Sequence, residues 1–156
     1  MVGRGFQEIG APLAEQEIRF GLATTRIGHT IHLLQTVDST NDEAAALAAG
    51  GALEGTIVIA DAQRHGKGRM GRSWASPGGV GIYLSVILRP VIPAHDAPSL
   101  TLLGAVAVAE AIEDVTGLAA GVKWPNDLIV RGRKVGGILG EVEAEVSRLH
   151  YVVLGI

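Results

Sequence analysis

Residues 122–142, VKWPNDLIVRGRKVGGILGEV, decide the fold. Short β-branched and apolar segments at Val122–Trp124 and Leu128–Val130 are followed by Val135–Val142, and the last two flank the tight turn Arg131-Gly132-Arg133. Segments of this length, broken by Pro and Gly, are too short for helices and are typical of strands in hairpins. This stretch therefore predicts antiparallel strands.

Outside this stretch the sequence predicts single helices and further strands. Ala44–Ala49 follows a capping-box pattern at Thr40–Glu43 and ends at Gly50-Gly51, which predicts a short helix. Other apolar patterns predict helices over Pro12–Leu22 and Ser99–Val115, and strands over His29–Val37, Thr56–Ala60, Ile82–Leu88 and Leu149–Leu154. Helices that come early and hairpins that come late favour an α+β fold over a doubly wound one. We expect a mixed, largely antiparallel sheet flanked by helices.

Length and composition predict one domain over residues 1–156. The chain has 156 residues, 47% of them hydrophobic, and contains no cysteine, which excludes disulfides and thiol chemistry. Its longest apolar stretch, Leu100–Ala109, is far shorter than the roughly 20 residues that span a bilayer, and no signal peptide is visible. We expect a soluble, cytoplasmic protein. A net charge of -3 argues against a nucleic-acid-binding surface.

The charges are unevenly distributed along the chain. No acidic residue occurs between Asp61 and Asp96, an interval that contains Arg64, Lys67, Arg69, Arg72 and Arg89. A local basic loop in an acidic protein indicates a small anionic ligand.

The loop at Gly66–Gly71 has the GxGxxG spacing of dinucleotide-binding folds, but its context is wrong. The residues that follow, Arg72–Gly79, are a poor helix start, and no acidic residue stands about 20 positions later to bind a ribose. A P-loop is excluded because the chain has no Gly-Lys-Ser or Gly-Lys-Thr. Glycines and cations could still converge on phosphate oxygens here, with Trp74 stacking on a base or anchoring the loop. A solvent-exposed basic turn stays an open alternative.

A second cluster, Lys123-Trp124-Pro125-Asn126-Asp127, combines a cation, an aromatic ring and short polar side chains. Lys134 follows Asp127 across the predicted hairpin, so both charges could reach one ligand. Gly136 and Gly137 in a strand interior suggest close approach of a ligand. The alternative is a surface salt bridge worth at most about 1 kcal/mol. The histidines show no metal-ligand spacing.

These segments together resemble the signature blocks of biotin protein ligases in order and spacing. The matching blocks are Asp38-Ser39-Thr40-Asn41, Gln63 ahead of Gly66–Trp74, Lys123–Leu128 and Arg133–Leu139, within a resemblance that runs from about Ile27 to the last residue. The resemblance implies the fold shared by class II aminoacyl-tRNA synthetases and biotin synthetases. It also implies a ligase that uses ATP and Mg²⁺ to convert biotin to biotinyl-5′-AMP and transfers it to a lysine of a biotin carboxyl carrier protein domain of a carboxylase.

The same resemblance assigns site residues. The residues implied to bind biotin are Ser39, Thr40, Asn41, Gln63, Gly66, Lys67, Gly68, Arg69, Lys134 and Gly136. Those implied to bind the nucleotide are Arg69, Arg72, Trp74, Lys123, Asn126, Asp127 and Lys134. Lys134, Arg69 and Asp127 are the implied catalytic residues. Magnesium would be held mainly by the ATP phosphates, with Asp127 as the candidate for a direct contact.

The sequence also departs from the family pattern. It stops within a predicted strand at Val153–Ile156 and carries no C-terminal β domain, so we expect a C-terminally truncated catalytic domain. The roughly 25 residues before the matched region are too few for a winged helix-turn-helix, so we expect no DNA-binding domain. Two rival functions stay open: a lipoate or octanoate ligase, although its typical Arg-Arg-Gly-Gly-Gly run is missing, and a nucleotide-binding module without catalysis. A homodimer is also left open.

Overall fold

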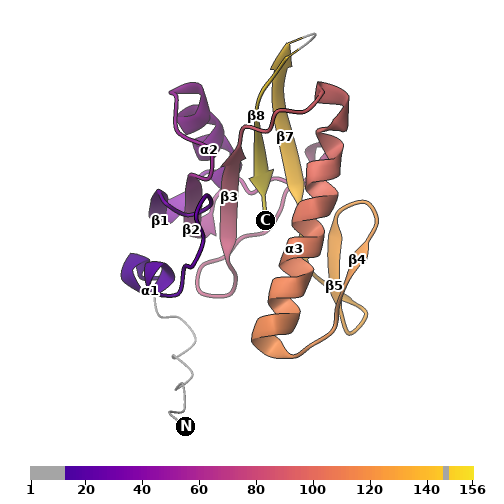
Figure 1. The fold of residues 1–156 in the computed structure, drawn as a ribbon. Coiled ribbons are helices and arrows are strands. Elements are labelled where there is room, and N and C mark those ends of the chain that lie inside the picture. Colours follow the sequence, from indigo (N-terminus) through magenta and orange to yellow (C-terminus); the bar gives the residue numbers. More distant parts are fainter. Residues whose placement is uncertain (1–12, 146–147) are drawn as a thin grey trace.

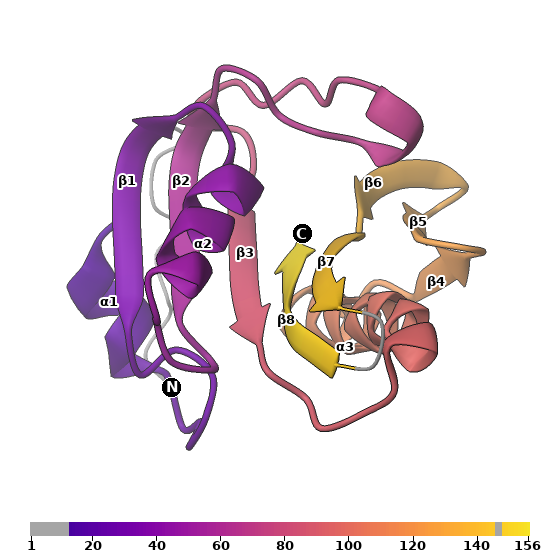
Figure 2. The same ribbon diagram turned by 90° about the horizontal axis from the view of Figure 1, so that it is seen from above.

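The computed structural model describes residues 13–145 and 148–156 and contains two sheets. The larger sheet has the strand order β1-β2-β3-β8-β7, and β4-β5-β6 form a three-stranded sheet beside it. Figures 1 and 2 show the larger sheet beside the smaller one. The strands are β1 (Ile31–Val37), β2 (Ile57–Gln63), β3 (Tyr83–Leu88), β4 (Ala120–Lys123), β5 (Asp127–Val130), β6 (Arg133–Gly137), β7 (Leu139–Glu145) and β8 (Arg148–Gly155).

The predicted α+β class is confirmed, because β1 and β2 pair in parallel and all other neighbouring strands pair antiparallel. The parallel pair is joined by helix α2 (Thr40–Ala49), as a parallel connection requires a crossover. The capping prediction was displaced by one position. Ser39 caps α2 through its side chain, which accepts a hydrogen bond from the backbone N–H of Asp42.

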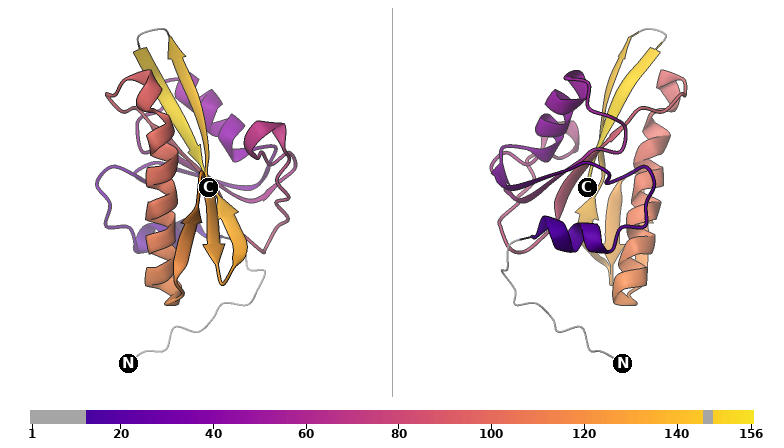
Figure 3. Two further views of the ribbon diagram at one scale, coloured as in Figure 1. Left: turned by 90° about the vertical axis from the view of Figure 1, so that its right-hand side faces the viewer. Right: turned by 60° about the vertical axis from the view of Figure 1, so that its left-hand side comes forward.

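Helices cover both faces of the larger sheet. On one face Ala44 and Ala48 of α2 pack on Val58, Ile87 and Val153. Helix α1 (Glu15–Phe20) and helix α3 (Pro98–Thr116) lie on the other face, where successive strand residues point the opposite way. Figure 3 shows α2 and α3 on opposite sides of the strands.

Helix α3 also connects the two sheets. Its residue Ala105 packs with Leu128 of β5, Leu154 of β8 and Ile138, which lies between β6 and β7. A side chain at Gly104 would approach a Leu154 methyl carbon to 2.6 Å, so this glycine permits the close contact between helix and sheet. The small sheet is thereby fixed relative to the large one.

The predicted single strand over Val135–Val142 was wrong, because the chain changes sheets at Ile138. The backbone N–H of Ile138 donates to the carbonyl of Asn126 (2.9 Å), and the side-chain amide of Asn126 donates to the carbonyl of Ile138 (2.9 Å). These bonds replace strand pairing at a completely buried residue, a constraint that an apolar sequence run cannot reveal.

The remaining predicted elements form at shifted bounds. The first helix is shorter than predicted, and Pro12, its predicted start, lies outside the described residues. The turn between β5 and β6 is confirmed, with positive φ at Arg131 (50°) and Gly132 (74°). Two short 3-10 helices, Arg69–Gly71 and Ala94–Asp96, complete the secondary structure of the described residues. Within residues 13–145 and 148–156, no helix is long and apolar enough to cross a membrane.

Arg89 has a structural role, which corrects its inclusion in the ligand-binding basic interval. Its guanidinium donates to the carbonyls of Ala48 (2.7 Å), Ala52 (2.9 Å) and His150 (3.3 Å). The first two carbonyls lie at and just beyond the end of α2, where helical partners run out. Arg89 therefore ties the end of α2 to strands β3 and β8.

Replacing Arg89 by Met should lower the free energy of unfolding by about 2–3 kcal/mol, because several partly buried carbonyls lose a charged donor. Urea denaturation measures this. The control is Arg64→Ala, which removes an exposed pair with Asp38 (3.2 Å) and should cost less than about 1 kcal/mol. Equal losses in the two variants would show that Arg89 does not hold the helix end.

Candidate functional site

A pocket of about 480 Å³ lies between the two sheets. Its walls are the start of α2, the end of β2, the loop at residues 64–82, the end of β8 and the β5–β6 hairpin. Figure 2 shows the loop after β2 crossing from the large sheet to a position beside β6. The glycine-rich loop and the hairpin, far apart in sequence, therefore face the same space.

The inner end of the pocket is a chain of hydrogen-bonded polar side chains. Gln63 Oε1 accepts from the backbone N–H of Thr40 (2.8 Å) and lies 3.1 Å from Thr40 Oγ1. Gln63 Nε2 donates to Ser76 Oγ (2.9 Å), which connects this end to the far side of the loop. Ser39 Oγ also lines the pocket and accepts a long contact of 3.4 Å from Asp42 N–H. Its hydroxyl hydrogen can therefore point into the pocket.

Asn41 braces α2 with both ends of its side-chain amide. Its Oδ1 accepts from Ser85 Oγ (2.6 Å), and its Nδ2 donates to Glu141 Oε2 (2.7 Å). Because Ser85 has a single hydroxyl hydrogen and Asn41 Oδ1 can only accept, Thr40 Oγ1 (2.9 Å away) is left to donate toward Ser85 or Gln63. The biotin contact that the resemblance implied for Asn41 would have to compete with these bonds.

Backbone hydrogen bonds within the loop close its tip. Gly68 N–H donates to the Arg72 carbonyl (2.7 Å), and Trp74 N–H donates to the Gly66 carbonyl (2.7 Å), so these two amides are already bonded within the loop. A side chain at Gly66 would meet the Trp74 carbonyl at 2.4 Å. Met70 bends the tip with φ 59°.

The base of the loop is anchored by a second group of polar contacts. Asp61 Oδ1 accepts from Gly79 N–H (3.0 Å), and the Tyr83 hydroxyl donates to the Pro77 carbonyl (3.0 Å). Burial raises the pKa of the Tyr83 phenol, and the charge of Asp61 adds a smaller effect in the same direction. The phenol therefore stays protonated and can donate. These contacts anchor the base of the loop. The tip, residues Lys67–Ser73, is held in place across the pocket by contacts of its side chains.

Lys67 holds one side of the tip. Its ammonium pairs with Asp42, at the start of α2, and with Glu141 of β7 (3.4 Å). The hydrogen bond to Asp42, supported by the charge of Glu141, raises the pKa of Lys67 against the opposing effect of burial. Lys67 thus stays charged at neutral and mildly alkaline pH.

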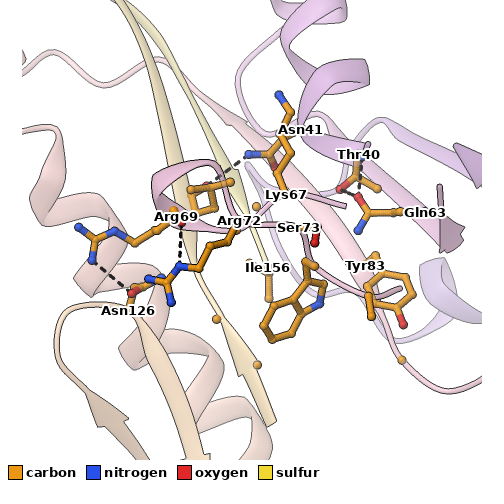
Figure 4. Close-up of a pocket in the computed structure, with 18 of the residues that line it drawn as sticks. Thr40, Asn41, Gln63, Lys67, Arg69, Arg72, Ser73, Tyr83, Asn126 and Ile156 are labelled. Carbon is orange, nitrogen blue, oxygen red and sulfur yellow. Dashed lines mark hydrogen bonds between the residues drawn. The ribbon is translucent and has the colours of Figure 1, made fainter. Parts of the chain in front are cut away.

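Arg69 holds the other side of the tip. Figure 4 shows it reaching across to Asn126, where its Nη1 lies 3.4 Å from Oδ1. Arg72 Nε donates to the Arg69 carbonyl (3.3 Å), so both guanidinium groups lie at the hairpin end of the pocket. The tip therefore spans the pocket from α2 to the hairpin.

The hairpin contributes a charged pair to the same end. Lys134 Nζ donates to Asp127 Oδ1 (2.6 Å) and lies 5.0 Å from the centre of the Trp74 ring. Asp127 and Lys134 lie on neighbouring strands as predicted, and the salt bridge of the alternative interpretation is present, but both residues line the pocket. Lys134, Arg69 and Arg72 together make this end cationic.

Most of the predicted site residues are brought together. Those lining the pocket are Ser39, Thr40, Asn41, Gln63, Lys67, Gly68, Arg69, Arg72, Trp74, Asn126, Asp127, Lys134 and Gly136. Gly66 is buried within the loop, and Lys123 is exposed at the end of β4; neither lines the pocket. Arg64 pairs with Asp38 outside it.

Sequence reasoning missed several residues on β3, β7 and β8. Tyr83, Leu139, Gly155 and Ile156 line the pocket, and Ser85 and Glu141 hold its polar wall. Each lies in or next to a strand that reads as ordinary core, and a register between distant strands is needed to place it. A buried Ser in the apolar run of β3 was the one available signal.

Within the described residues no group of three His, Cys, Asp or Glu side chains is placed to hold a metal ion. Among the described residues that line the pocket, Asp127 carries the one side-chain carboxylate, and it is paired with Lys134. This donor set suits an ion brought by a phosphate ligand better than a resident metal.

Comparison with known proteins now identifies the family. A model of the biotin/lipoate A/B protein ligase family matches residues 33–156. The chain belongs to this family. It is 46% identical over 155 residues to the bifunctional ligase/repressor BirA of Bacillus subtilis, covering 98% of this chain and 48% of that protein. This member of the family is also 36% identical to the biotin–[acetyl-CoA-carboxylase] ligase of Mycobacterium tuberculosis, covering 93% of this chain and 55% of the other.

A solved structure gives the same result for the fold. The biotin protein ligase of Leishmania major in complex with biotinyl-5-AMP matches with a TM-score of 0.66 and 30% identity, over 81% of this chain and 56% of that one. The expected fold of biotin synthetases is therefore confirmed for this family member. The chain spans about half the length of the curated relatives it matches.

Gly155→Ala should destabilise the protein by about 1–3 kcal/mol, because its Cβ would lie 2.1 Å from Asn41 Oδ1 and force the braced amide to move. Thermal or urea denaturation measures the loss. Gly121→Ala is the matched control in a strand, since the nearest atom to its Cβ would be 4.0 Å away. Equal free energies of unfolding for the two variants would show that the tight contact at Asn41 does not constrain this position.

Proposed function

We propose that the protein activates biotin with ATP to form biotinyl-5′-AMP and transfers the biotinyl group to a lysine of a carrier protein. One observation carries the proposal: a single pocket has a polar, hydrogen-bonding inner end at Thr40 and Gln63 and a cationic outer end at Arg69 and Lys134. Biotin has the matching polarity, with a ureido ring at one end and a carboxylate at the other. The solved relative from Leishmania major, which holds biotinyl-5-AMP, supports it.

The polar inner end favours biotin over lipoate. The ureido group offers one carbonyl oxygen and two N–H groups, which suit a hydroxyl donor at Ser39 and acceptor oxygens at Thr40 and Gln63. The dithiolane ring of lipoate offers no N–H or carbonyl group. It would leave these polar side chains without ligand partners after water is expelled, a loss that discriminates strongly between otherwise similar ligands.

The cationic outer end suits adenylate formation without a protein nucleophile. A biotin carboxylate oxygen attacks the α-phosphorus of ATP, the bond to the bridging oxygen breaks, and pyrophosphate leaves. Arg69, Arg72 and Lys134, which line the pocket, would offset negative charge on the phosphoryl group during its transfer. The loop tip would shield the mixed anhydride from water.

The second step transfers the biotinyl group to an amine. The neutral amine of an acceptor lysine attacks the biotinyl carbonyl, AMP leaves with the electrons of the anhydride bond, and the new amide nitrogen loses a proton.

Mg²⁺, when it is bound with ATP, would neutralise charge on the phosphates. Asn126 and Asp127 are the residues of this chain that would face it.

The acceptor that we propose is the biotin carboxyl carrier domain of acetyl-CoA carboxylase or a related carboxylase. The name of the relative from Mycobacterium tuberculosis, a biotin–[acetyl-CoA-carboxylase] ligase, supports this choice. A cytoplasmic location would supply ATP and suits a chain without cysteine. That the protein binds no nucleic acid stays a prediction from its net charge.

Pyrophosphate exchange into ATP should depend on biotin and not on lipoate, because the inner end of the pocket pairs with a ureido group. The measurement uses radiolabelled pyrophosphate with each acid at equal concentration. Exchange that responds to lipoate would contradict the choice of biotin. Tight nucleotide binding with no exchange for either acid would indicate a module without catalysis.

Lys134→Ala should slow adenylate formation by about 2–4 kcal/mol of activation free energy, the scale of one preorganised charge contact. Single-turnover formation of the adenylate is the measurement, and the circular dichroism spectrum should not change. Arg133→Ala, an exposed neighbour on β6, serves as the control. Turnover of the Lys134 variant near that of the control would refute the role of Lys134.

A further inference from the structure

Glu141 of β7 contacts two residues that line the pocket, Asn41 and Lys67. Its Oε2 accepts from the Asn41 amide (2.7 Å), and its Oε1 lies 3.4 Å from the Lys67 ammonium. We propose that Glu141 is a positioning residue: it holds Lys67 so that one ammonium N–H faces the carboxylate of biotin. This proposal rests on the proposed function for the identity of the ligand.

The Lys67 side chain needs a partner that fixes its ammonium, because it lies on a loop between two glycines. It stands between Gly66 and Gly68 at the start of the loop tip, and a lysine side chain loses much rotational freedom when it is fixed. An ammonium has three N–H donors. The carboxylates of Asp42 and Glu141 occupy two of them, which leaves one for a ligand in the pocket that Lys67 lines.

Glu141 is well placed to fix this geometry. It belongs to β7, whose backbone pairs with β8 (Glu141 opposite Val153), so its Cα is set by the sheet and not by the loop. Asp42, the other partner of Lys67, is on the exposed side of α2. Glu141 therefore fixes the position of the Lys67 ammonium relative to the sheet.

The other oxygen of Glu141 acts on the inner end of the pocket. By accepting from Asn41 Nδ2 it fixes which way the amide points, so that Oδ1 faces Ser85. Ser85 in turn lies 2.9 Å from Thr40 Oγ1, next to Gln63. One carboxylate thus contacts both the polar network at the start of α2 and the Lys67 ammonium on the α2 side of the loop tip.

Two substitutions separate these contacts. Glu141→Gln keeps an oxygen that can accept from Asn41 and removes the charge that holds Lys67. Glu141→Ala removes both. Calorimetric titration compares biotin, which carries the carboxylate, with biotin amide, which is neutral at that position and keeps the ureido ring.

Glu141→Gln should raise the Kd for biotin about threefold to fivefold, the scale of an exposed ion pair, and leave the Kd for biotin amide unchanged. Glu141→Ala should raise both. In a Lys67→Met background, Glu141→Gln should have no further effect on the Kd for biotin. An unchanged or lower Kd for biotin in Glu141→Gln would overturn the proposal, because it would make Glu141 a bystander or a competitor of the ligand.

Glu143→Gln is the matched control, since Glu143 is the next residue on the same face of β7 and is exposed. It should leave every Kd at the wild-type value. An effect equal to that of Glu141→Gln would show a general charge effect and would also overturn the proposal.

Hydrogen exchange without any ligand separates failure of this proposal from failure of the proposed function. Glu141→Gln should speed amide exchange at Gly68 and Trp74, whose bonds close the tip, and Glu143→Gln should not. If wild-type protein does not bind biotin, the proposed function fails. If exchange at the tip is the same in both variants, Glu141 does not hold Lys67, whatever the ligand is.

Discussion

The structure depends on a hydrogen-bonded contact at the centre of the large sheet, where Ser85 meets Thr40 and Asn41. Ser85 is completely buried, and its hydroxyl lies 2.6 Å from the Asn41 amide oxygen. A polar group at this depth is costly unless it is paired, so the start of α2 can occupy one position over the sheet. That position brings Ser39 and Thr40 to the pocket and requires Gly155 on the neighbouring strand.

The rest of the pocket is built outward from this fixed wall. Gln63 carries the polar chain to Ser76 in the loop, and Glu141 carries it to Lys67 at the other end of the loop tip. Arg69 then extends from the tip to Asn126 on the hairpin. Two residues of the loop, Lys67 and the buried Ser76, are thus linked to the same buried contact. Charge and polarity are separated along the pocket because the wall is polar and the tip is basic.

The sequence predicted the fold class and most elements, because capping residues, glycines and alternating apolar segments act locally. The charged pair of Asp127 and Lys134 was also within reach, since a short turn brings them onto neighbouring strands. The change of sheets at Ile138 was not, because it depends on hydrogen bonds from Asn126. Arg89 was misread for a similar reason: its partners are carbonyls of distant residues, which no pattern of side chains displays. Glu141 was missed because strand register between β7 and β8 sets its place.

The pair of hydrogen bonds between Asn126 and Ile138 has a consequence for how a ligand enters and leaves the pocket. The main chain and the side chain of Asn126 both grip Ile138, and α3 packs on the same junction, so the hairpin is rigidly joined to the sheet. The tip of the loop is held across the pocket by the side chains of Lys67 and Arg69. The cavity therefore has a stationary floor and one movable wall. Opening that wall requires the exposed ion pairs of Lys67 and the hydrogen bond from Arg69 to Asn126 to break, and salt weakens the Lys67 pairs.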